Sequence, residues 1–456
     1  MIRKVGALDP SWGKVHLVGI GGSGMSAIAR VLSEAGFEVS GSDLRESSVL
    51  ASLRSLGVTI HVGHDPDHLR DADLAIVSAA VDPSNPEVEA AVRLDVPILS
   101  RGEALALIVG GTRTIAISGT HGKTTTSGMV ATILETAGTD PTYLLGADLA
   151  HRGAGGHLGA GVVAVVEADE AYGSFLWLRP AIAVVTNVDE DHLDHYGNRQ
   201  KLDQAFSRFL SQATESVVVC QEDSSAMSVA GPFNPITYGF SPECRVSASS
   251  LEIDASTSTF DLALRSRNHR VCLRIGGRHN VLNALAAAAA CSLLGIGSIE
   301  IVAGLEAFSG VSRRFEFRGT CLGADLIDDY AHHPAEIDAT LVAARGGPWK
   351  RLIAVFQPHL YSRTQAMWRE FGRALCLADM IVVTDIYGAR EQPLPGITGK
   401  LVVDSVCEHS PGKRVAYLPR LEDAAEYLAG LLRPGDLLLS LGAGDVTTLP
   451  DRLIKQ

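Results

Sequence analysis

Short runs of aliphatic and β-branched residues alternate with amphipathic helical stretches through most of the chain. This alternation is typical of parallel βαβ units, in which a helix follows each strand and packs on the sheet. The first unit is expected to comprise a strand at Val15–Val18, a glycine turn, a helix from Met25 to about Ala35 closed by Gly36, and a strand at Glu38–Ser42. The pattern therefore predicts the α/β fold class.

The same alternation recurs along the rest of the chain. Further strands are expected at Leu74–Val77, Val96–Leu99, Thr114–Ser118, Val162–Val166, Ala181–Thr186, Leu352–Phe356, Met380–Thr384 and Leu437–Leu441. A helix is expected from Lys201 to about Leu210, and a more antiparallel stretch between Ser216 and Ile275. An alanine-rich helix begins near His279, as expected for a helix that packs closely on a sheet.

Two breaks in the pattern, at Gly110-Gly111 and Ser309-Gly310, mark the expected domain boundaries. At about 150 residues per domain, the chain has room for three domains that each bury a core. We expect them at 1–110, 111–312 and 313–456. The first and third are expected to be Rossmann-like α/β domains.

The net charge and the hydropathy of the chain limit the kinds of molecule that it can bind. The chain has 39 Lys and Arg against 52 Asp and Glu, a formal net charge of −13, and no basic run offsets it. A nucleic-acid polymer or an anionic membrane is therefore a poor partner. The longest apolar stretch, Ala284–Leu294, is shorter than the ~20 residues of a membrane-spanning helix. With no signal-peptide pattern and no C-x-x-C pair among the cysteines, we expect a cytoplasmic protein with reduced thiols.

The segment Ser118–Thr126, SGTHGKTTT, lies directly between an expected strand and an expected helix. Its small residues let successive N–H groups converge on phosphate oxygens at the positive end of the helix. Lys123 would reach the β- and γ-phosphates, and the Thr124 hydroxyl would bind Mg²⁺. The loop is shorter than the general G-x-x-x-x-G-K-[ST] pattern, because Ile117 replaces the first glycine and Gly119 starts the loop. The segment predicts a P-loop ATPase-like central domain; the alternative is a tight turn with a chance lysine.

A second glycine-rich loop, Gly19–Gly24, follows the first strand, and Asp43 follows the second. Together they resemble a dinucleotide fingerprint, in which the acid binds a ribose hydroxyl. The same loop holds the diphosphate of any nucleotide, so it supports a Rossmann-like domain more strongly than it supports NAD. The alternative is a plain helix-entry turn without a ligand.

Two acidic segments follow expected strands of the central domain. The segment Glu167–Glu170 directly follows the expected strand Val162–Val166, and the segment Thr186–Asp194 lies at the end of the expected strand Ala181–Thr186. Because the carboxyl ends of parallel strands share one edge, both segments are expected to face the phosphates. Carboxylates there suit a hard cation, and His192 can complete a second metal position. The alternative is that they are ordinary solvated loop acids.

The alanine-rich helix and the expected hinge after it carry further candidates. His279 and Asn283 are four residues apart and share a helix face, so both can touch one flat ring. Arg314 lies where an arginine can reach a phosphate between two domains. The alternatives are helix-capping or surface polar groups and an ordinary surface arginine.

Two strand ends of the third block are rich in histidine, arginine and tyrosine, at Asp328–Pro334 and Phe356–Thr364. The adjacent pair His332-His333 does not predict structural zinc, because neighbouring residues seldom face one ion and no thiolate or HExxH pattern lies nearby. A positive and aromatic surface facing the nucleotide is the better interpretation.

Taken together, these motifs resemble the Mur ligase family of cell-wall synthesis. The strings that carry the resemblance are GIGGSGMS, GTHGKTTT, EADE, TNVDEDHLDHYG, GRHNVLNALAA, GVSRRFEF, DDYAHHPAEI and QPHLYSRT. They cover nearly the whole chain, and GIGGSGMS separates it from the ligases that add later residues of the peptide and from folylpolyglutamate synthases. The resemblance is to the members that join L-alanine to the carboxylate of UDP-N-acetylmuramate.

The resemblance implies a reaction and a set of ligands. ATP phosphorylates the carboxylate of UDP-N-acetylmuramate to an acyl phosphate, the amine of L-alanine attacks it, and phosphate leaves. The implied ligands are ATP and Mg²⁺, with two ions expected, and the chain is expected to be a monomer or a homodimer. The three domains would hold the UDP-sugar, hold ATP, and close over ATP and the amino acid. Catalysis would come mainly from positioning and neutralisation of charge.

The resemblance also implies site residues in this sequence. The expected catalytic residues are Lys123, Glu167, Asn187, His192, Arg314, His332 and Arg363, and the expected metal ligands are Thr124, Glu167 and His192. ATP is expected at Gly119, Thr120, His121, Gly122, Lys123, Thr124, Thr125, His279, Asn283, Asp329 and Tyr330. The UDP-sugar is expected at Gly19, Gly21, Gly22, Ser23, Gly24, Met25, Ser26 and Asp43, with His359 at the substrate or product carboxylate.

Three positions depart from many members of the family. Ala171-Tyr172 replaces a Ser-Asp pair, Leu360 replaces an arginine, and Gly388–Glu391 replaces a P-A-G-E turn, with Arg390 as a substitute cation. These changes concern the choice of amino acid and leave the phosphate site intact. Two other functions stay open on the residues alone, an NAD-dependent oxidoreductase and a non-catalytic nucleotide-binding switch.

Overall fold

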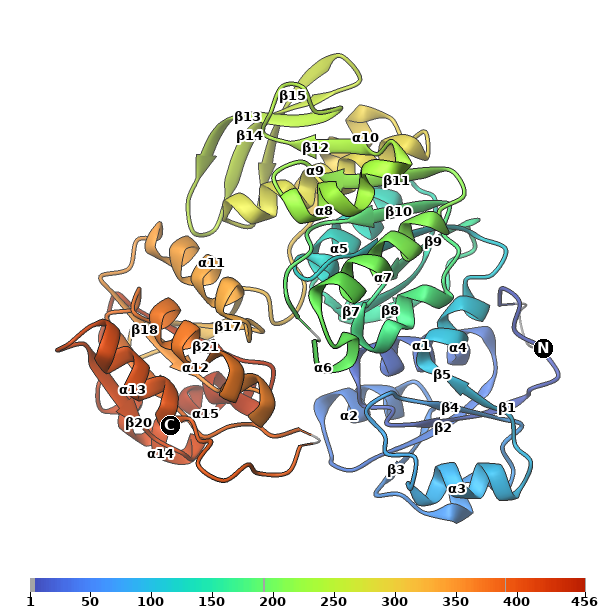
Figure 1. The fold of residues 1–456 in the computed structure, drawn as a ribbon, viewed down its shortest axis with the longest axis horizontal. Coiled ribbons are helices and arrows are strands. Elements are labelled where there is room, and N and C mark those ends of the chain that lie inside the picture. The colour runs from blue at the N-terminus through green and yellow to red at the C-terminus, as the bar shows by residue number, and fades with distance from the viewer. Residues whose placement is uncertain (1–4, 192, 390, 456) are drawn as a thin grey trace. The chain divides into compact units, whose positions relative to one another are not determined.

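The fold is α/β, as predicted, and is built on three sheets (Figure 1). The computed structural model describes residues 5–191, 193–389 and 391–455. The chain divides into two compact units, of which the first contains the N-terminal and central sheets and the second contains the C-terminal sheet. No helix of the described residues is long and apolar enough to cross a membrane. The seven cysteines are all unpaired in these residues.

The N-terminal sheet has the strand order β3-β2-β1-β4-β5, and every neighbouring pair is parallel. Its strands are β1 (Lys14–Val18), β2 (Glu38–Asp43), β3 (Thr59–Val62), β4 (Leu74–Val77) and β5 (Ile98–Ser100). Its helices are α1 (Ser23–Ala35), α2 (Ser48–Ser55), η1 (Pro66–Leu69), α3 (Pro86–Arg93) and α4 (Arg101–Ile108). Chain order reverses beside β1, so the ligand edge predicted for the Gly19 loop is a topological switch point.

Alternation along β1 decides which face of the sheet each side chain joins. Val15 and Leu17 pack in one core with Leu32 of α1. Ala75 of β4, which pairs with His16, packs with Ala90 of α3 on the opposite face. The sheet is therefore covered on both faces, which fits the apolar sequence of its central strand β4.

The central sheet has the order β15-β14-β13-β12-β11-β10-β6-β9-β7-β8. Its strands are β6 (Arg113–Ser118), β7 (Thr142–Leu149), β8 (Ala154–His157), β9 (Val163–Glu167), β10 (Ile182–Val185), β11 (Ser216–Cys220), β12 (Ile236–Gly239), β13 (Val246–Ile253), β14 (Ser258–Leu264) and β15 (Arg267–Leu273). Its helices are α5 (Lys123–Thr136), η2 (Ala171–Trp177), α6 (Leu193–Tyr196), α7 (Arg199–Ser211), α8 (Ser224–Ala230), η3 (Gly231–Phe233), α9 (Arg278–Leu293) and α10 (Ser298–Ala307). The predicted helix at Lys201–Leu210 is α7.

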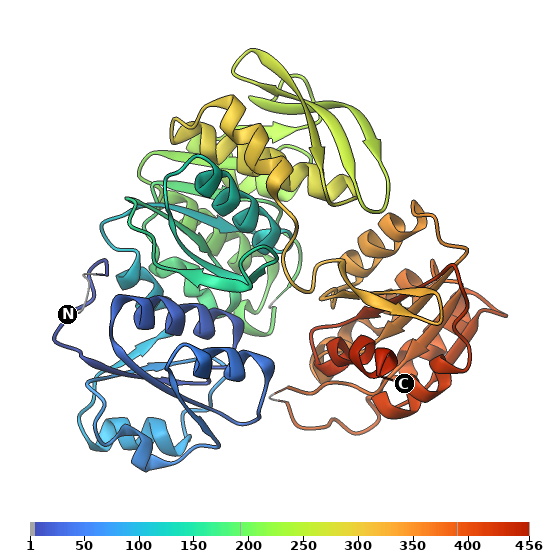
Figure 2. The ribbon, with the colours of Figure 1, turned by 180° about the vertical axis from the view of Figure 1, so that it is seen from behind.

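The antiparallel stretch predicted for Ser216–Ile275 is wrong in its first part. β11 and β12 pair in parallel with their neighbours and extend the central sheet. The helix α8 supplies the crossover that a parallel pair requires, and its 7 residues are too few to show a helical hydrophobic pattern. On this sheet α10 packs against α5, where Gly304 lets the helices approach so closely that a Cβ would lie 2.4 Å from the Cα of Ile133 (Figure 2).

The C-terminal sheet has the order β16-β17-β21-β18-β19-β20, parallel except for the β16–β17 pair. Its strands are β16 (Glu316–Cys321), β17 (Ala324–Asp329), β18 (Arg351–Phe356), β19 (Met380–Val383), β20 (Arg414–Tyr417) and β21 (Asp436–Leu441). Its helices are α11 (Pro334–Arg345), α12 (Tyr361–Leu375), α13 (Lys400–His409), α14 (Leu421–Ala429), η4 (Asp445–Thr448) and α15 (Leu449–Ile454).

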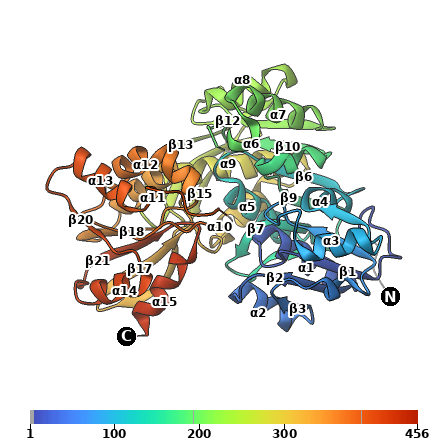
Figure 3. The same ribbon diagram turned by 60° about the horizontal axis from the view of Figure 1, so that its bottom comes forward.

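Helices cover both faces of this sheet, α11, α12 and α13 on one side and α14 and α15 on the other (Figure 3). Successive residues of β18 alternate between the two cores: Leu352 and Ala354 join the first, and Ile353 and Val355 join the second. All the strand ends that carry predicted site residues therefore lie at one edge of a sheet that is buried on both faces.

Candidate active site

The predicted phosphate loop joins β6 directly to α5. Gly119 has φ +130° and Gly122, which precedes the helix, has φ +81°. A Cβ at Gly119 would lie 2.1 Å from Thr186 Oγ1, and one at Gly122 would lie 2.5 Å from Asn283 Oδ1. Only glycine fits these two positions, because the backbone conformation and the space both exclude a side chain. The predicted ATP residues Thr124 and Thr125 are buried in the first turn of α5.

The chain after β10 braces this loop. The amides of Thr120 and His121 donate to the backbone and side-chain oxygens of Asn187, at 3.1 and 2.8 Å. The Asn187 amide donates back to the carbonyl oxygen of His121 at 3.0 Å, and Thr186 Oγ1 donates to the same oxygen at 2.6 Å. The structure therefore places Asn187, a predicted catalytic residue, against the loop backbone, where it sets the shape of the loop.

Lys123 is held by a carboxylate that follows β9. Its Nζ lies 3.0 and 2.9 Å from the two carboxylate oxygens of Glu170 and donates to the carbonyl oxygen of Gly119 at 2.6 Å. Burial alone would lower the pKa of Lys123, but the charges of Glu170, Asp169 and Glu167 raise it above its ordinary value. The lysine is therefore a fixed cation at the mouth of the loop.

Each of the three acids at the end of β9 and just after it has a different partner. Glu167 accepts a hydrogen bond from the amide of Gly146 at 2.7 Å, Asp169 pairs with Arg101 at 3.0 Å, and Glu170 pairs with Lys123. A Cβ at Gly146 would lie 2.5 Å from Glu167 Oε2, so a glycine in β7 makes room for the predicted metal ligand. The sequence motif did not distinguish these three roles.

Arg101 was not predicted and links the two sheets of the first unit. It starts α4, and its Nη2 donates to Asp169 Oδ2 and Ser174 Oγ, both at 3.0 Å. Its Nη1 would lie 2.7 Å from a Cβ at Gly24, in the N-terminal glycine loop. A single arginine at the first position of a helix gives no sequence signal of its own, since only the fold brings it to this place.

A cavity of about 60 Å³ lies between the two predicted ligand edges of the first unit. It is lined by Ser23, Gly24, Ala27, Ile28, Arg101, Leu105, Leu144, Leu145, Gly146, Glu167 and Asp169. The N-terminal glycine loop and the predicted metal ligand therefore meet in one place, although they belong to different sheets. A larger hollow beside Gly110-Gly111 carries none of the predicted site residues.

In the N-terminal glycine loop, Gly19 has φ +80° and Gly22 precedes α1. The amide of Gly21 donates to Asp43 Oδ2 at 2.9 Å, so Asp43 contacts the loop itself. Ser23 and Ser26 lie in the first turn of α1, where the Ser26 hydroxyl donates to the carbonyl oxygen of Ser23 at 2.9 Å. The remaining predicted residue, Met25, is buried in the core, which leaves only its backbone for a ligand.

The two residues predicted around a flat ring both lie on α9. Asn283 Oδ1 accepts a hydrogen bond from Thr126 Oγ1 at 3.2 Å, so it is held at the phosphate loop. His279 belongs to the second unit, and its side chain is exposed. The shared ring site stays a prediction.

In the second unit, Asp329 at the end of β17 anchors the segment around Arg314. Its two carboxylate oxygens accept hydrogen bonds from the amides of Phe315 and Ala331, at 2.7 and 2.8 Å. Burial raises the pKa of Asp329 to about 6, although Arg314 and the two backbone bonds oppose the rise. Asp329 is therefore a constrained, partly desolvated acid and not a surface group.

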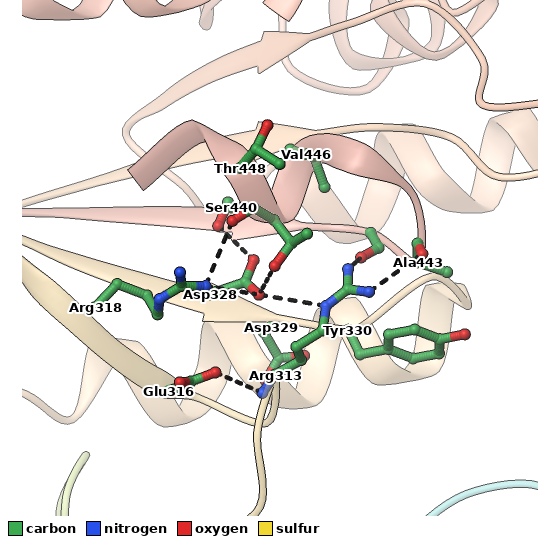
Figure 4. A network of polar contacts seen from close by, with 12 residues as sticks. Arg313, Glu316, Arg318, Asp328, Asp329, Tyr330, Ser440, Ala443, Val446 and Thr448 are labelled. Atoms are coloured by element: carbon green, nitrogen blue, oxygen red, sulfur yellow. Dashed lines mark hydrogen bonds and ion pairs between the residues drawn. The ribbon is translucent and has the colours of Figure 1, made fainter. Parts of the chain in front are cut away.

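The adjacent arginines after the hinge have different surroundings. Arg313 donates to the carbonyl oxygens of Gly442 and Gly444, at 2.7 and 3.2 Å, and pairs with buried Asp328 at 3.4 Å (Figure 4). Its guanidinium also lies 4.8 Å from the ring centre of Tyr330. Arg314 lies 5.2 Å from the same ring and 3.5 Å from Glu336. Arg313 thus holds the end of β21 in place, and Arg314 lies between the Tyr330 ring and Glu336.

The predicted histidines and arginine of the second unit come together at the ends of β17 and β18. The His332 ring lies 5.1 Å from that of Tyr330 and 5.9 Å from that of His359, and Arg363 Nη1 lies 3.4 Å from His359 Nδ1. Burial lowers the pKa of His332 to about 3, so its ring is neutral at neutral pH. Leu360, which follows His359, has φ +69°. The structure thus brings these side chains together in one cluster, and their role at a nucleotide stays a prediction.

Two residues of the prediction lie outside the described residues. They are His192, predicted as the second metal ligand, and Arg390, suggested as a substitute for the arginine missing at Leu360. Glu391, which follows Arg390, accepts a hydrogen bond from the amide of Ser362 at 2.9 Å and so caps the start of α12. Tyr172, at the first departure, has φ +55° and its ring contacts that of His195.

Comparison with known proteins matches the whole chain to one family. Residues 14–113 match the Mur ligase family catalytic domain, 117–291 the Mur ligase middle domain, and 313–444 the Mur ligase glutamate ligase domain. A UDP-N-acetylmuramate--L-alanine ligase of Cutibacterium acnes is 46% identical over 460 residues, covering 98% of this chain and 97% of the relative. One of Kineococcus radiotolerans is 46% identical over 450 residues, covering 96% and 94%.

Solved structures agree with this result. The crystal structure of a UDP-N-acetylmuramate-alanine ligase from Thermotoga maritima matches with a TM-score of 0.84 and 31% identity, covering 97% of this chain and 98% of that one. A murein peptide ligase from Psychrobacter arcticus matches with a TM-score of 0.74 at 24% identity, covering 97% and 98%. The second likeness supports the fold.

Proposed function

Because the chain belongs to the Mur ligase family, we propose that it joins L-alanine to the carboxylate of UDP-N-acetylmuramate at the expense of ATP, in peptidoglycan synthesis. A carboxylate is a poor electrophile until one of its oxygens becomes a leaving group. Transfer of the γ-phosphoryl group to that oxygen gives an acyl phosphate and ADP. The amine of L-alanine then attacks the acyl carbon, and inorganic phosphate leaves with the bonding electron pair.

The observation that carries this proposal is the cavity shared by the N-terminal glycine loop and the acidic segment after β9. Gly24 belongs to the loop proposed to hold the diphosphate of the UDP-sugar, and Glu167 belongs to the segment that faces the ATP loop. A substrate bound at Gly24 therefore extends toward the groups that act on the γ-phosphate. An NAD-dependent oxidoreductase would leave the loop at Lys123 without a role.

In this proposal the described residues position the phosphates and neutralise their charge. Backbone amides at the start of α5 face the phosphate oxygens, and Lys123 contacts the β- and γ-phosphates. Asn187 contributes by holding the loop in its shape. The net charge of −13 repels both polyanionic substrates, so binding depends on these local groups.

The residues present also fit Mg²⁺. Glu167 and the Thr124 hydroxyl supply oxygen donors, the ligands that this ion prefers, and Gly146 leaves space for the carboxylate. Bound Mg²⁺ would neutralise the charge on the transferring phosphoryl group. We propose that His192 would hold a second Mg²⁺, which would neutralise further negative charge at the site.

The remaining assignments extend the proposal to the rest of the chain. We propose that domain 1–110 binds the UDP-sugar, 111–312 binds ATP, and 313–456 closes over ATP and the amino acid. His279, Asn283, Asp329 and Tyr330 would surround adenosine, and Arg314, His332, His359 and Arg363 would contact phosphate and the carboxylates. We further propose a cytoplasmic monomer or homodimer that binds no nucleic-acid polymer and no membrane.

Release of inorganic phosphate tests the proposal. With ATP, Mg²⁺, UDP-N-acetylmuramate and L-alanine together we expect turnover, and omission of any one should return the rate to background. No phosphate release with all four present would contradict the ligase function. Competition among L-alanine, glycine and L-serine then measures the amino-acid preference.

A further inference from the structure

Four histidines surround one buried glutamate on the face of the N-terminal sheet that α3 covers. The glutamate is Glu87 of α3. The histidines are His16 of β1, His61 of β3, His64 just after β3, and His68 of η1. His16 and Glu87 are distant in the sequence from the segment that contains His61, His64 and His68, and neither the phosphate site nor the proposed reaction uses any of them.

The two oxygens of the Glu87 carboxylate have separate partners. Oε2 contacts His64 Nδ1 at 2.9 Å and accepts a hydrogen bond from the Ser42 hydroxyl. Oε1 lies 2.6 Å from His68 Nδ1 and 3.6 Å from His16 Nε2. The first oxygen is therefore fixed by its neighbours, while the second lies between two imidazole nitrogens.

His16 leaves one ring nitrogen without a hydrogen bond, although its side chain is fully buried. Its other nitrogen, Nδ1, lies 2.8 Å from Ser40 Oγ. If Nδ1 carries the proton, Nε2 directs a lone pair at a carboxylate. If Nε2 carries it, the 3.6 Å separation from Glu87 Oε1 is too long for a hydrogen bond. The second tautomer leaves a buried N–H without an acceptor, whereas in the first a bound cation would supply the partner that the Nε2 lone pair lacks.

We propose that His16 Nε2, His68 Nδ1 and Glu87 Oε1 bind one divalent transition-metal ion of the Zn²⁺ class. These three atoms lie within 4.8 Å of one another. Ligands about 2.0–2.1 Å from a tetrahedral ion are roughly 3.3 Å apart, and the two separations from Oε1, 2.6 and 3.6 Å, lie on either side of that value. Two imidazoles and one carboxylate suit Zn²⁺ better than Mg²⁺, which prefers oxygen ligands.

The surroundings supply the outer contacts that metal ligands require. Ser40 orients the His16 ring from its far nitrogen, and Ser42 and His64 hold the second carboxylate oxygen. Such partners fix the ring orientation and the tautomer of a ligand.

The site has a route to solvent and a structural consequence. His64 and His68 retain 11% and 18% exposure of their side chains, so an ion can enter from their side. The three ligands come from β1, η1 and α3, and a bound ion would fasten these elements to one another. Zn²⁺ is therefore expected to raise the thermal unfolding midpoint of the protein.

Zn²⁺ binding to the full-length protein tests the proposal. After dialysis against a chelator, and without Mg²⁺ or ATP, we expect one Zn²⁺ per chain by calorimetry, and X-ray absorption should show two imidazoles per zinc. The Glu167→Gln variant, altered at the proposed Mg²⁺ site, should keep this binding. Wild-type protein that takes up no zinc, or loses it with Glu167→Gln, would overturn the proposal.

A matched pair of variants separates the ligand from its neighbour. The His61 and His68 rings stack 3.8 Å apart, so phenylalanine preserves the stacking at either position and removes the nitrogens. His68→Phe should weaken Zn²⁺ binding by more than the 10–100-fold typical of losing an outer-shell partner, and His61→Phe should weaken it by less than about tenfold. Glu87→Gln should also abolish binding. Unchanged binding in His68→Phe, or a larger loss in His61→Phe, would refute the assignment.

Discussion

Removing the carboxylate of Glu170 tests whether this acid holds the phosphate-loop lysine. Lys123 Nζ lies 2.9 and 3.0 Å from the two carboxylate oxygens, and the two side chains are 12% and 2% exposed. At an effective dielectric constant of ~20, charges at this distance attract by on the order of 5 kcal/mol. Removing one partner of a buried pair leaves the other charge uncompensated, which typically costs about 3–5 kcal/mol.

Glu170→Ala should fall at the lower end of that range. The carbonyl oxygen of Gly119 still accepts a hydrogen bond from Nζ at 2.6 Å, and Asp169 and Glu167 still attract the ammonium. We expect the free energy of unfolding in urea to fall by about 3 kcal/mol. Because Nζ loses its fixed position, kcat/KM for ATP should fall on the order of 100-fold.

A double variant separates stability from catalysis. Lys123→Met with Glu170→Leu replaces the pair by apolar side chains of similar size, a change that is often neutral or stabilising. The double variant should therefore regain most of the stability that Glu170→Ala loses and still lack turnover. The reasoning fails if Glu170→Ala unfolds within about 1 kcal/mol of the wild type and keeps its kcat/KM for ATP, since the ion pair would then hold neither the fold nor the lysine.

Three further predictions follow from single contacts. Gly122→Ala should abolish ATP turnover, because its Cβ would lie 2.5 Å from Asn283 Oδ1. The control Gly138→Ala, at φ +73° with open space around it, should lower only the thermal unfolding midpoint. Equal losses of activity in the two variants would contradict this prediction. Asp43→Ala removes the acceptor of the Gly21 amide and should raise KM for the UDP-sugar about tenfold while KM for ATP stays constant, as steady-state kinetics can check. Burial lowers the pKa of His332 to about 3 in the folded protein, against 6.5 in the unfolded chain. Between these two pH values only the unfolded chain carries the imidazole proton. The contribution of His332 to the free energy of unfolding is therefore complete above about pH 6.5 and is lost as the pH falls toward 3. His332→Gln should reduce the slope of unfolding free energy there by up to about 1.4 kcal/mol per pH unit, and an unchanged slope would contradict the shift.

Local patterns in the sequence determined much of the fold. The strand at Leu74–Val77 was predicted with its observed ends, and Gly36 closes α1 in the left-handed conformation because glycine alone adopts it freely. The phosphate loop and the acidic strand ends were also predicted, since a short motif that joins a strand to a helix fixes its own geometry. The parallel pairing of β11 and β12 was missed, because pairing direction depends on a crossover and not on the strands themselves.

Tertiary structure decided which of the similar residues has which partner. The EADE motif contains three acids, and only the fold assigns Glu167 to the amide of Gly146, Asp169 to Arg101 and Glu170 to Lys123. Arg101 and the histidines around Glu87 carry no motif, because their partners lie tens of residues away along the chain. The sequence by itself therefore determined the fold class and the phosphate chemistry, which depend on local spacing. The convergence of the N-terminal glycine loop on Glu167 and the His16–His68–Glu87 cluster depend on long-range packing, which only the folded chain provides.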